Sequence, residues 1–99
     1  MEIDIKLLGT WNIDPKDSES LKQMGKVTMT FQEDNILKYI VQDKGTIQIS
    51  SLTYWIEKGF IKTIQLPSKD EESTAYVLEN TQVLLLTKDK LTSKFLKSE

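Results

Sequence analysis

The sequence predicts an all-β protein, a small antiparallel meander barrel of about eight short strands. Strand-like segments recur about every ten residues, polar turns separate them, and no segment is long enough for the helices that connect parallel strands. An open sheet of this size exposes two edges, and closure into a barrel removes them. We expect a single domain over residues 1–99, because a chain of 99 residues supplies only one modest core.

The elements expected along the chain begin with a strand at residues 8–13, after a stretch with room for one helical turn. Pro15 ends this strand, because proline lacks a backbone donor and restricts the residue before it. Residues 16–25 are polar, and Asp17 or Ser18 is of the type that caps the start of a helix. We therefore expect a short helical or loop segment near residues 16–25 that covers one mouth of the barrel.

After that segment, apolar and polar residues alternate, which is the pattern of strands with one dry face. Polar turns such as Glu33-Asp34-Asn35 divide this part of the chain into hairpins. In the longest expected strand the apolar parity changes at Ser50-Ser51, which predicts a bulge or a short break there. The strands expected in this part cover residues 26–32, 37–41, 46–56, 60–66, 73–79, 82–87 and 91–96.

The residues expected inside the barrel have two interpretations. Barrels of this size are just wide enough to be filled by side chains or to admit one small ligand. The large side chains and short strands favour a packed core. In the alternative, Met29, Phe31, Tyr39, Tyr54 and Tyr76 bind a small hydrophobic ligand, and the tyrosine hydroxyls orient it. The whole candidate interior set is Val27, Met29, Phe31, Leu37, Tyr39, Val41, Ile47, Ile49, Leu52, Tyr54, Ile56, Tyr76, Leu78, Leu85 and Phe95.

Gly9 and Trp11 lie two residues apart in the first expected strand, and so on the same face. This Gly-x-Trp motif, the polar segment after it and a meander that ends in a basic residue resemble the lipocalin superfamily, more narrowly its compact bacterial lipocalin-like domains. The resemblance implies a barrel closed at its floor by Trp11, with a basic side chain of the last strand across the indole. Lys94 matches that position best, and Lys97 is the alternative. Gly9 lets the neighbouring backbone approach Trp11 closely.

The composition excludes several classes of catalytic and metal site. The chain has no Cys and no His, which excludes Cys/His zinc sites, thiol nucleophiles and Ser-His-Asp triads. Acidic clusters such as Glu33-Asp34 and Asp70-Glu71-Glu72 fall in expected exposed turns. We therefore expect a lipocalin-like protein that is not an enzyme, with no metal and no cofactor, whose biological role the sequence does not name.

Trp55 offers an alternative function as a protein-interaction module. It is expected to point outward, because Tyr54 and Ile56 beside it belong to the inner set. Either a neighbouring segment covers Trp55, or it forms an outer apolar patch with Ile40 and Ile61. Such a patch would serve a homodimer or another protein partner.

Charge and hydropathy limit which other partners and locations the sequence allows. The formal charge is −2 and all 13 basic residues are lysine, which argues against nucleic acid. No apolar run is long enough for a transmembrane helix. No signal peptide is visible either, and an export or lipoprotein signal removed from the chain remains an open alternative, so the compartment is not predicted.

Overall fold

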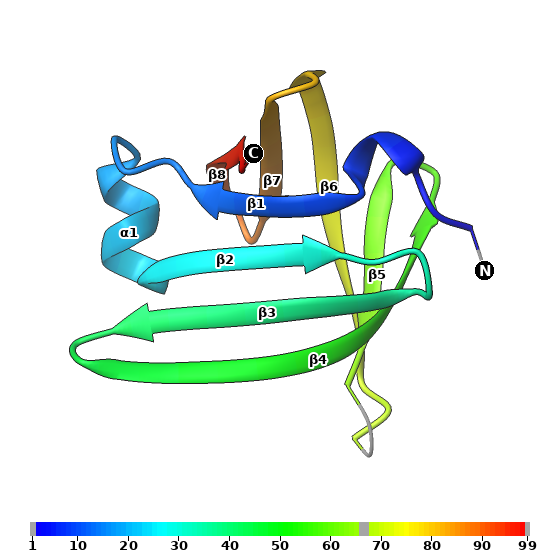
Figure 1. Ribbon diagram of the computed structural model, residues 1–99, viewed down its shortest axis with the longest axis horizontal. Coiled ribbons are helices and arrows are strands. Elements are labelled where there is room, and N and C mark those ends of the chain that lie inside the picture. Colours follow the sequence, from blue (N-terminus) through cyan, green and yellow to red (C-terminus); the bar gives the residue numbers. More distant parts are fainter. Residues whose placement is uncertain (1, 66–67, 99) are drawn as a thin grey trace.

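The computed structural model describes residues 2–65 and 68–98, and in this part of the chain eight antiparallel strands form a closed barrel (Figure 1). Each strand pairs with the next, and β8 returns to β1, which confirms the expected meander barrel. The expected end of the fifth strand at Leu66 lies outside the described residues. The elements are η1 (Ile5–Leu7), a 3-10 helix, β1 (Gly9–Ile13), α1 (Ser18–Met24), β2 (Lys26–Phe31), β3 (Ile36–Asp43), β4 (Thr46–Glu57), β5 (Phe60–Ile64), β6 (Glu71–Asn80), β7 (Val83–Lys88) and β8 (Leu91–Lys97).

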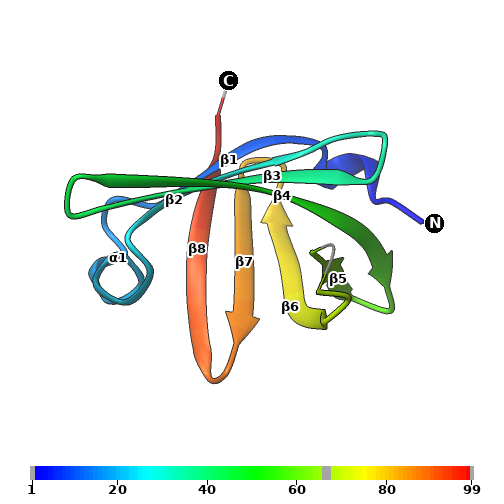
Figure 2. The ribbon, with the colours of Figure 1, turned by 90° about the horizontal axis from the view of Figure 1, so that it is seen from below.

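Strands β1, β2 and β3 run across the direction of strands β6, β7 and β8 (Figure 2). The longest strand, β4, has 12 residues and joins these two halves. Its residues 46–53 pair with β3, and its residues 53–57 pair with β5. The inner faces of the two halves enclose the hydrophobic core.

The ladder between β3 and β4 is continuous, which corrects the break expected at Ser50-Ser51. All eight register pairs between these strands follow one another without a shift. Ile47 and Ile49 therefore point outward, with exposed fractions of 59% and 71%, and do not belong to the interior. The inner positions of this part of β4 are the polar Gln48 and Ser50, which solvent reaches, so apolar parity does not indicate the buried face here.

Helix α1 is tied to strand β8. The Asp17 carboxylate caps the helix by accepting from the backbone N–H of Ser20 at 3.2 Å, and it also accepts from the backbone N–H of Lys94 at 3.0 Å. Partial burial opposes ionisation of Asp17, but these hydrogen bonds outweigh it and lower its pKa. The buried Ser20 hydroxyl donates to the Ser93 hydroxyl at 2.8 Å. These contacts hold α1 against the barrel wall.

One end of the barrel is sealed around Trp11, which is fully buried. Its indole N–H donates to the Leu7 carbonyl at 2.8 Å, and the Lys97 ammonium lies 4.7 Å from the ring centroid. The same ammonium donates to the Leu8 carbonyl. Gly9 has φ +114°, and a Cβ on it would lie 2.8 Å from Lys97 Nζ. The glycine therefore makes room for the Lys97 side chain, and it adopts a backbone conformation that other residues rarely take.

The lysine over the indole is Lys97, and the assignment of Lys94 to this position is wrong. Phe95 is buried, so the alternation of the strand turns Lys94 outward. Leu85, its register partner in β7, also points outward instead of into the interior. The Lys94 ammonium lies 3.8 Å from the Asp14 carboxylate, and its side chain is 44% exposed.

Replacing each lysine by methionine separates these two roles. Lys97→Met keeps an apolar stem but removes the cation over Trp11 and the hydrogen bond to Leu8, so we expect a loss of about 1–3 kcal/mol in the free energy of unfolding. Lys94→Met removes only a half-exposed ion pair and is expected to cost less than about 1 kcal/mol. Urea denaturation followed by tryptophan fluorescence measures both. Equal losses in the two variants would contradict the assignment of Lys97.

Candidate functional site

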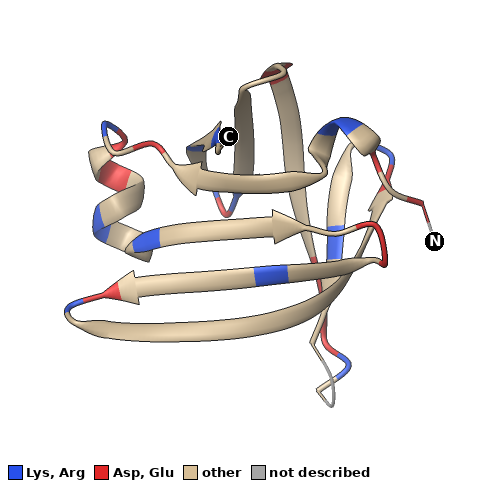
Figure 3. Ribbon diagram, in the orientation of Figure 1, with Lys and Arg blue, Asp and Glu red and all other residues tan. Residues whose placement is uncertain are grey.

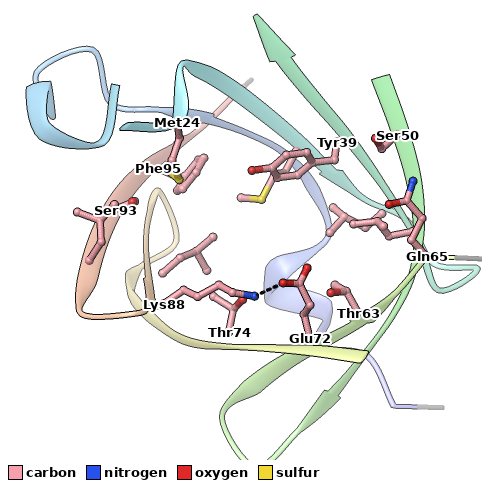
Figure 4. A pocket seen from close by; sticks show the side chains of 15 residues that line it. Met24, Tyr39, Ser50, Thr63, Gln65, Glu72, Thr74, Lys88, Ser93 and Phe95 are labelled. Atoms are coloured by element: carbon pink, nitrogen blue, oxygen red, sulfur yellow. Dashed lines mark hydrogen bonds and ion pairs between the residues drawn. The ribbon is translucent and has the colours of Figure 1, made fainter. Parts of the chain in front are cut away.

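A cavity of about 390 Å³ lies inside the barrel (Figure 4). Neither Leu7 nor Trp11, the residues of the sealed end, lines it. Exposed Gln65, Glu72 and Lys88 do line it, so the cavity opens to solvent on their side. The apolar part of its wall consists of Met24, Met29, Leu37, Leu52, Leu86, Leu91 and Phe95.

Tyr39 is the most distinctive polar residue in the cavity. It is half-buried, and its hydroxyl, which no described residue hydrogen-bonds, is reached by solvent and is not a buried unsatisfied group. Burial, and secondarily the Glu72 carboxylate, raises the pKa of Tyr39, so the phenol is neutral over the ordinary pH range. The hydroxyls of Ser50, Thr63 and Thr74 line the same space. The cavity thus offers hydroxyl groups that can donate to a ligand or accept from it.

An ion pair stands at the mouth. The Lys88 ammonium lies 2.7 Å from Glu72 Oε1, and the two side chains are 40% and 65% exposed. Because both are largely solvated, the pair contributes little to stability. Its significance is its position, since it places one carboxylate and one ammonium where a ligand would enter (Figure 4).

Two of the five expected ligand-binding residues, Met29 and Tyr39, line the cavity. Phe31, Tyr54 and Tyr76 do not, and this corrects their assignment. The rings of Phe31 and Tyr54 pack edge to face with centroids 5.1 Å apart. The Tyr54 hydroxyl donates to a backbone carbonyl at 2.8 Å, and the Tyr76 hydroxyl donates to a carboxylate oxygen at 2.9 Å. Strand parity shows which side chains point inward but not their depth along the barrel, and these three belong to the packed part.

Sequence reasoning missed the charged residues of the mouth. Glu72 has the parity of Tyr76 in β6, and Lys88 has the parity of Leu86 in β7, so both positions point inward. Extending the inner parity to the strand ends would have identified them. They were assigned to exposed turns because charge usually indicates a solvated position.

Comparisons with known proteins support the fold. No protein-family model matches the sequence, and no curated protein matches it either. A crystal structure of a lipocalin-like protein from Bacteroides uniformis is similar to this structure, with a TM-score of 0.67 over 94% of this chain and 99% of that one. The chain has a lipocalin-like fold. This confirms the resemblance predicted from the sequence, and at 16% sequence identity the likeness extends to the fold alone.

The outer patch expected on the lipocalin-like barrel is not assembled. Ile61 is buried, with 3% of its surface exposed, and belongs to the core. Ile40 and Trp55 are half-buried on the outer face, but Ile40 lies opposite Ile49 and Trp55 opposite Lys62. Ile49 and Trp55 are six residues apart on β4, which separates them by about 20 Å. Ile40 and Trp55 therefore do not form one surface.

Charged side chains are spread over the lipocalin-like barrel. Figure 3 shows acidic and basic residues interspersed, mainly in turns and near strand ends. Among the described residues, no three potential ligands converge to hold a metal ion. No helix in the described part of the chain is long and apolar enough to cross a membrane.

Tyr76 makes the stability of the lipocalin-like barrel pH-dependent in the alkaline range. Burial, then the hydrogen bond to Asp4, raises the pKa of Tyr76 to about 12. In the unfolded chain this group titrates near pH ~10, so the stabilisation is complete below about pH 10 and is lost as the pH rises toward 12.

We therefore expect Tyr76→Phe, which lacks both the hydrogen bond and the titration, to melt below the wild type at pH 8. The difference in Tm should narrow between pH 8 and pH 11. Thermal unfolding followed by circular dichroism measures it, and a difference that stays constant or widens would contradict the raised pKa.

Proposed function

We propose that this lipocalin-like protein binds a compact, mainly apolar small molecule in its barrel cavity, and that it acts as a binding protein and not as an enzyme. One observation carries the proposal: a space of about 390 Å³ whose wall is mainly apolar and includes the Tyr39 side chain. The likeness to a lipocalin-like structure supports a barrel of this kind.

The cavity size suits a ligand of one to three rings. Ligand pockets usually start at about 300 Å³, and a dry cavity of roughly 150 Å³ already admits benzene. A volume of about 390 Å³ therefore accommodates a fused two-ring body with one polar substituent. Apolar contacts with residues such as Leu52, Leu86 and Phe95 would supply most of the affinity.

The sealed end supports the proposal because it keeps the cavity preformed. Trp11, Phe31 and Tyr54 fill that end, and each is at most 2% exposed. A ligand therefore does not have to organise this part of the barrel, which reduces the entropy lost on binding.

The chemistry at the cavity favours binding over catalysis. A general acid or base works best when its pKa lies near the working pH. The pKa of Tyr39 is shifted in the opposite direction, upward from an already high value. Glu72 and Lys88 are paired with each other and solvated, which leaves no activated nucleophile among the described lining residues.

A cavity-filling variant tests the proposal. Ser50 faces the cavity beside Tyr39, its register partner, so Ser50→Phe places a ring in the space. The matched control is Ser51→Phe, because Ser51 is the next residue on the same strand, is exposed and faces outward toward Lys38. The probe is N-phenyl-1-naphthylamine, whose fluorescence rises in apolar surroundings. We expect wild type and Ser51→Phe to bind it alike, and Ser50→Phe to bind it about tenfold more weakly or worse.

Thermal unfolding of all three proteins verifies that the variants are folded. The absence of any fluorescence rise with the wild type, or equal affinity for wild type and Ser50→Phe, would overturn the proposal.

A further inference from the structure

We propose that the cavity selects a ligand that carries an amine over a carboxylate of the same shape, with the ammonium held by the Glu72 carboxylate. This inference rests on the proposed function, because it names the class of ligand that the same cavity takes. It is carried by the charges and hydrogen-bonding groups that line the mouth.

The Glu72 carboxylate has unused accepting capacity at the cavity. Its Oε1 atom is engaged by Lys88 at 2.7 Å, and no described residue donates to its Oε2 atom. Figure 4 shows Glu72 pointing into the cavity from β6, with Tyr39 across the space on β3 and Thr63 next to the carboxylate. The hydroxyl of Thr63, the register partner of Glu72, also accepts hydrogen bonds. An ammonium group has three donors, and these acceptors can take two of them.

The charge at the mouth is negative on balance. A second hollow of about 290 Å³ adjoins the cavity, since the two share Leu52, Thr63, Gln65 and Glu72. This hollow adds the Asp70 carboxylate to its lining. Across both spaces the described charged lining residues are two carboxylates, Glu72 and Asp70, and one ammonium, Lys88.

An ammonium and a carboxylate head group would interact differently with the net negative charge at the mouth. An ammonium compensates the excess negative charge while the Glu72–Lys88 pair remains intact. A carboxylate adds a third negative charge and must compete with Glu72 for Lys88. The negative charge of Glu72 also acts inside the cavity. It is the second cause, after burial, of the raised pKa of Tyr39. Geometry and charge therefore point the same way.

Three probes with one naphthalene body test the inference: 1-naphthylmethylamine, 1-naphthalenemethanol and 1-naphthoic acid. Their affinities for the wild type are measured by isothermal titration calorimetry at pH 7. We expect the amine to bind most tightly, the alcohol next and the acid most weakly. The ratio of amine to acid affinity is expected to be about fivefold or more, as for a partly solvated charge pair.

Charge variants identify the group responsible. Glu72→Gln should bring the ratio close to one. Glu71→Gln removes the same charge from the neighbouring residue, which pairs outside with Lys62, and should leave the ratio unchanged. Lys88→Gln frees the Glu72 carboxylate and should raise the affinity for the amine about two- to threefold.

The outcomes separate this inference from the proposed function. If N-phenyl-1-naphthylamine binds but naphthoic acid binds as tightly as the amine, the amine preference is overturned and cavity binding stands. A preference that Glu72→Gln leaves intact overturns the role of Glu72. If neither the naphthylamine dye nor any naphthalene probe binds, both proposals fall.

Discussion

The structure depends on the seam between β1 and β8, where the sheet closes on itself. Only three register pairs join these strands, compared with eight between β3 and β4. The Lys97 side chain reinforces this short seam, because it lies over the Trp11 indole and also bonds to the carbonyl of Leu8. The Lys97 side chain fits there because Gly9 has no side chain that would occupy the same space. Gly9, Trp11 and Lys97 thus stabilise the closed form of the barrel and keep its sealed end dry.

The interior of the barrel has two parts, a dry one around Trp11 and one that solvent reaches. Around Trp11 the aromatic side chains are buried, and the hydroxyl of Tyr54 is satisfied by a backbone carbonyl. Toward the mouth, the inner faces of the same strands carry Ser50, Glu72 and Lys88, which solvent reaches. A packed core and an open cavity therefore occupy different depths of one barrel, so the two interpretations that the sequence left open describe different parts of the interior.

The meander could be predicted because its signals are local: turns, spacing and the cap of α1 at Asp17 are each encoded within a few residues. Which side chains of a strand point into the barrel was predictable only where the inner face of that strand is shielded from water. Ile47, Ile49 and Leu85 were assigned to the interior on apolar character, whereas the register turns them outward. Lys97 and Lys94 differ by three residues and so by strand face, and the inward position predicted for Phe95 already placed Lys97, not Lys94, on the inner face. The cavity residues could not be separated from Phe31, Tyr54 and Tyr76, because their depth depends on the tilt and stagger of the whole barrel.

The location of the charged pair at the very ends of β6 and β7 has an evolutionary consequence. Residues there touch neither the indole nor the seam, so they can be exchanged at little cost to folding. The groups that stabilise the barrel and the charged groups at its mouth consequently occupy separate positions of the chain. In a barrel of this type the residues at the mouth can change during evolution while the sealed end stays the same.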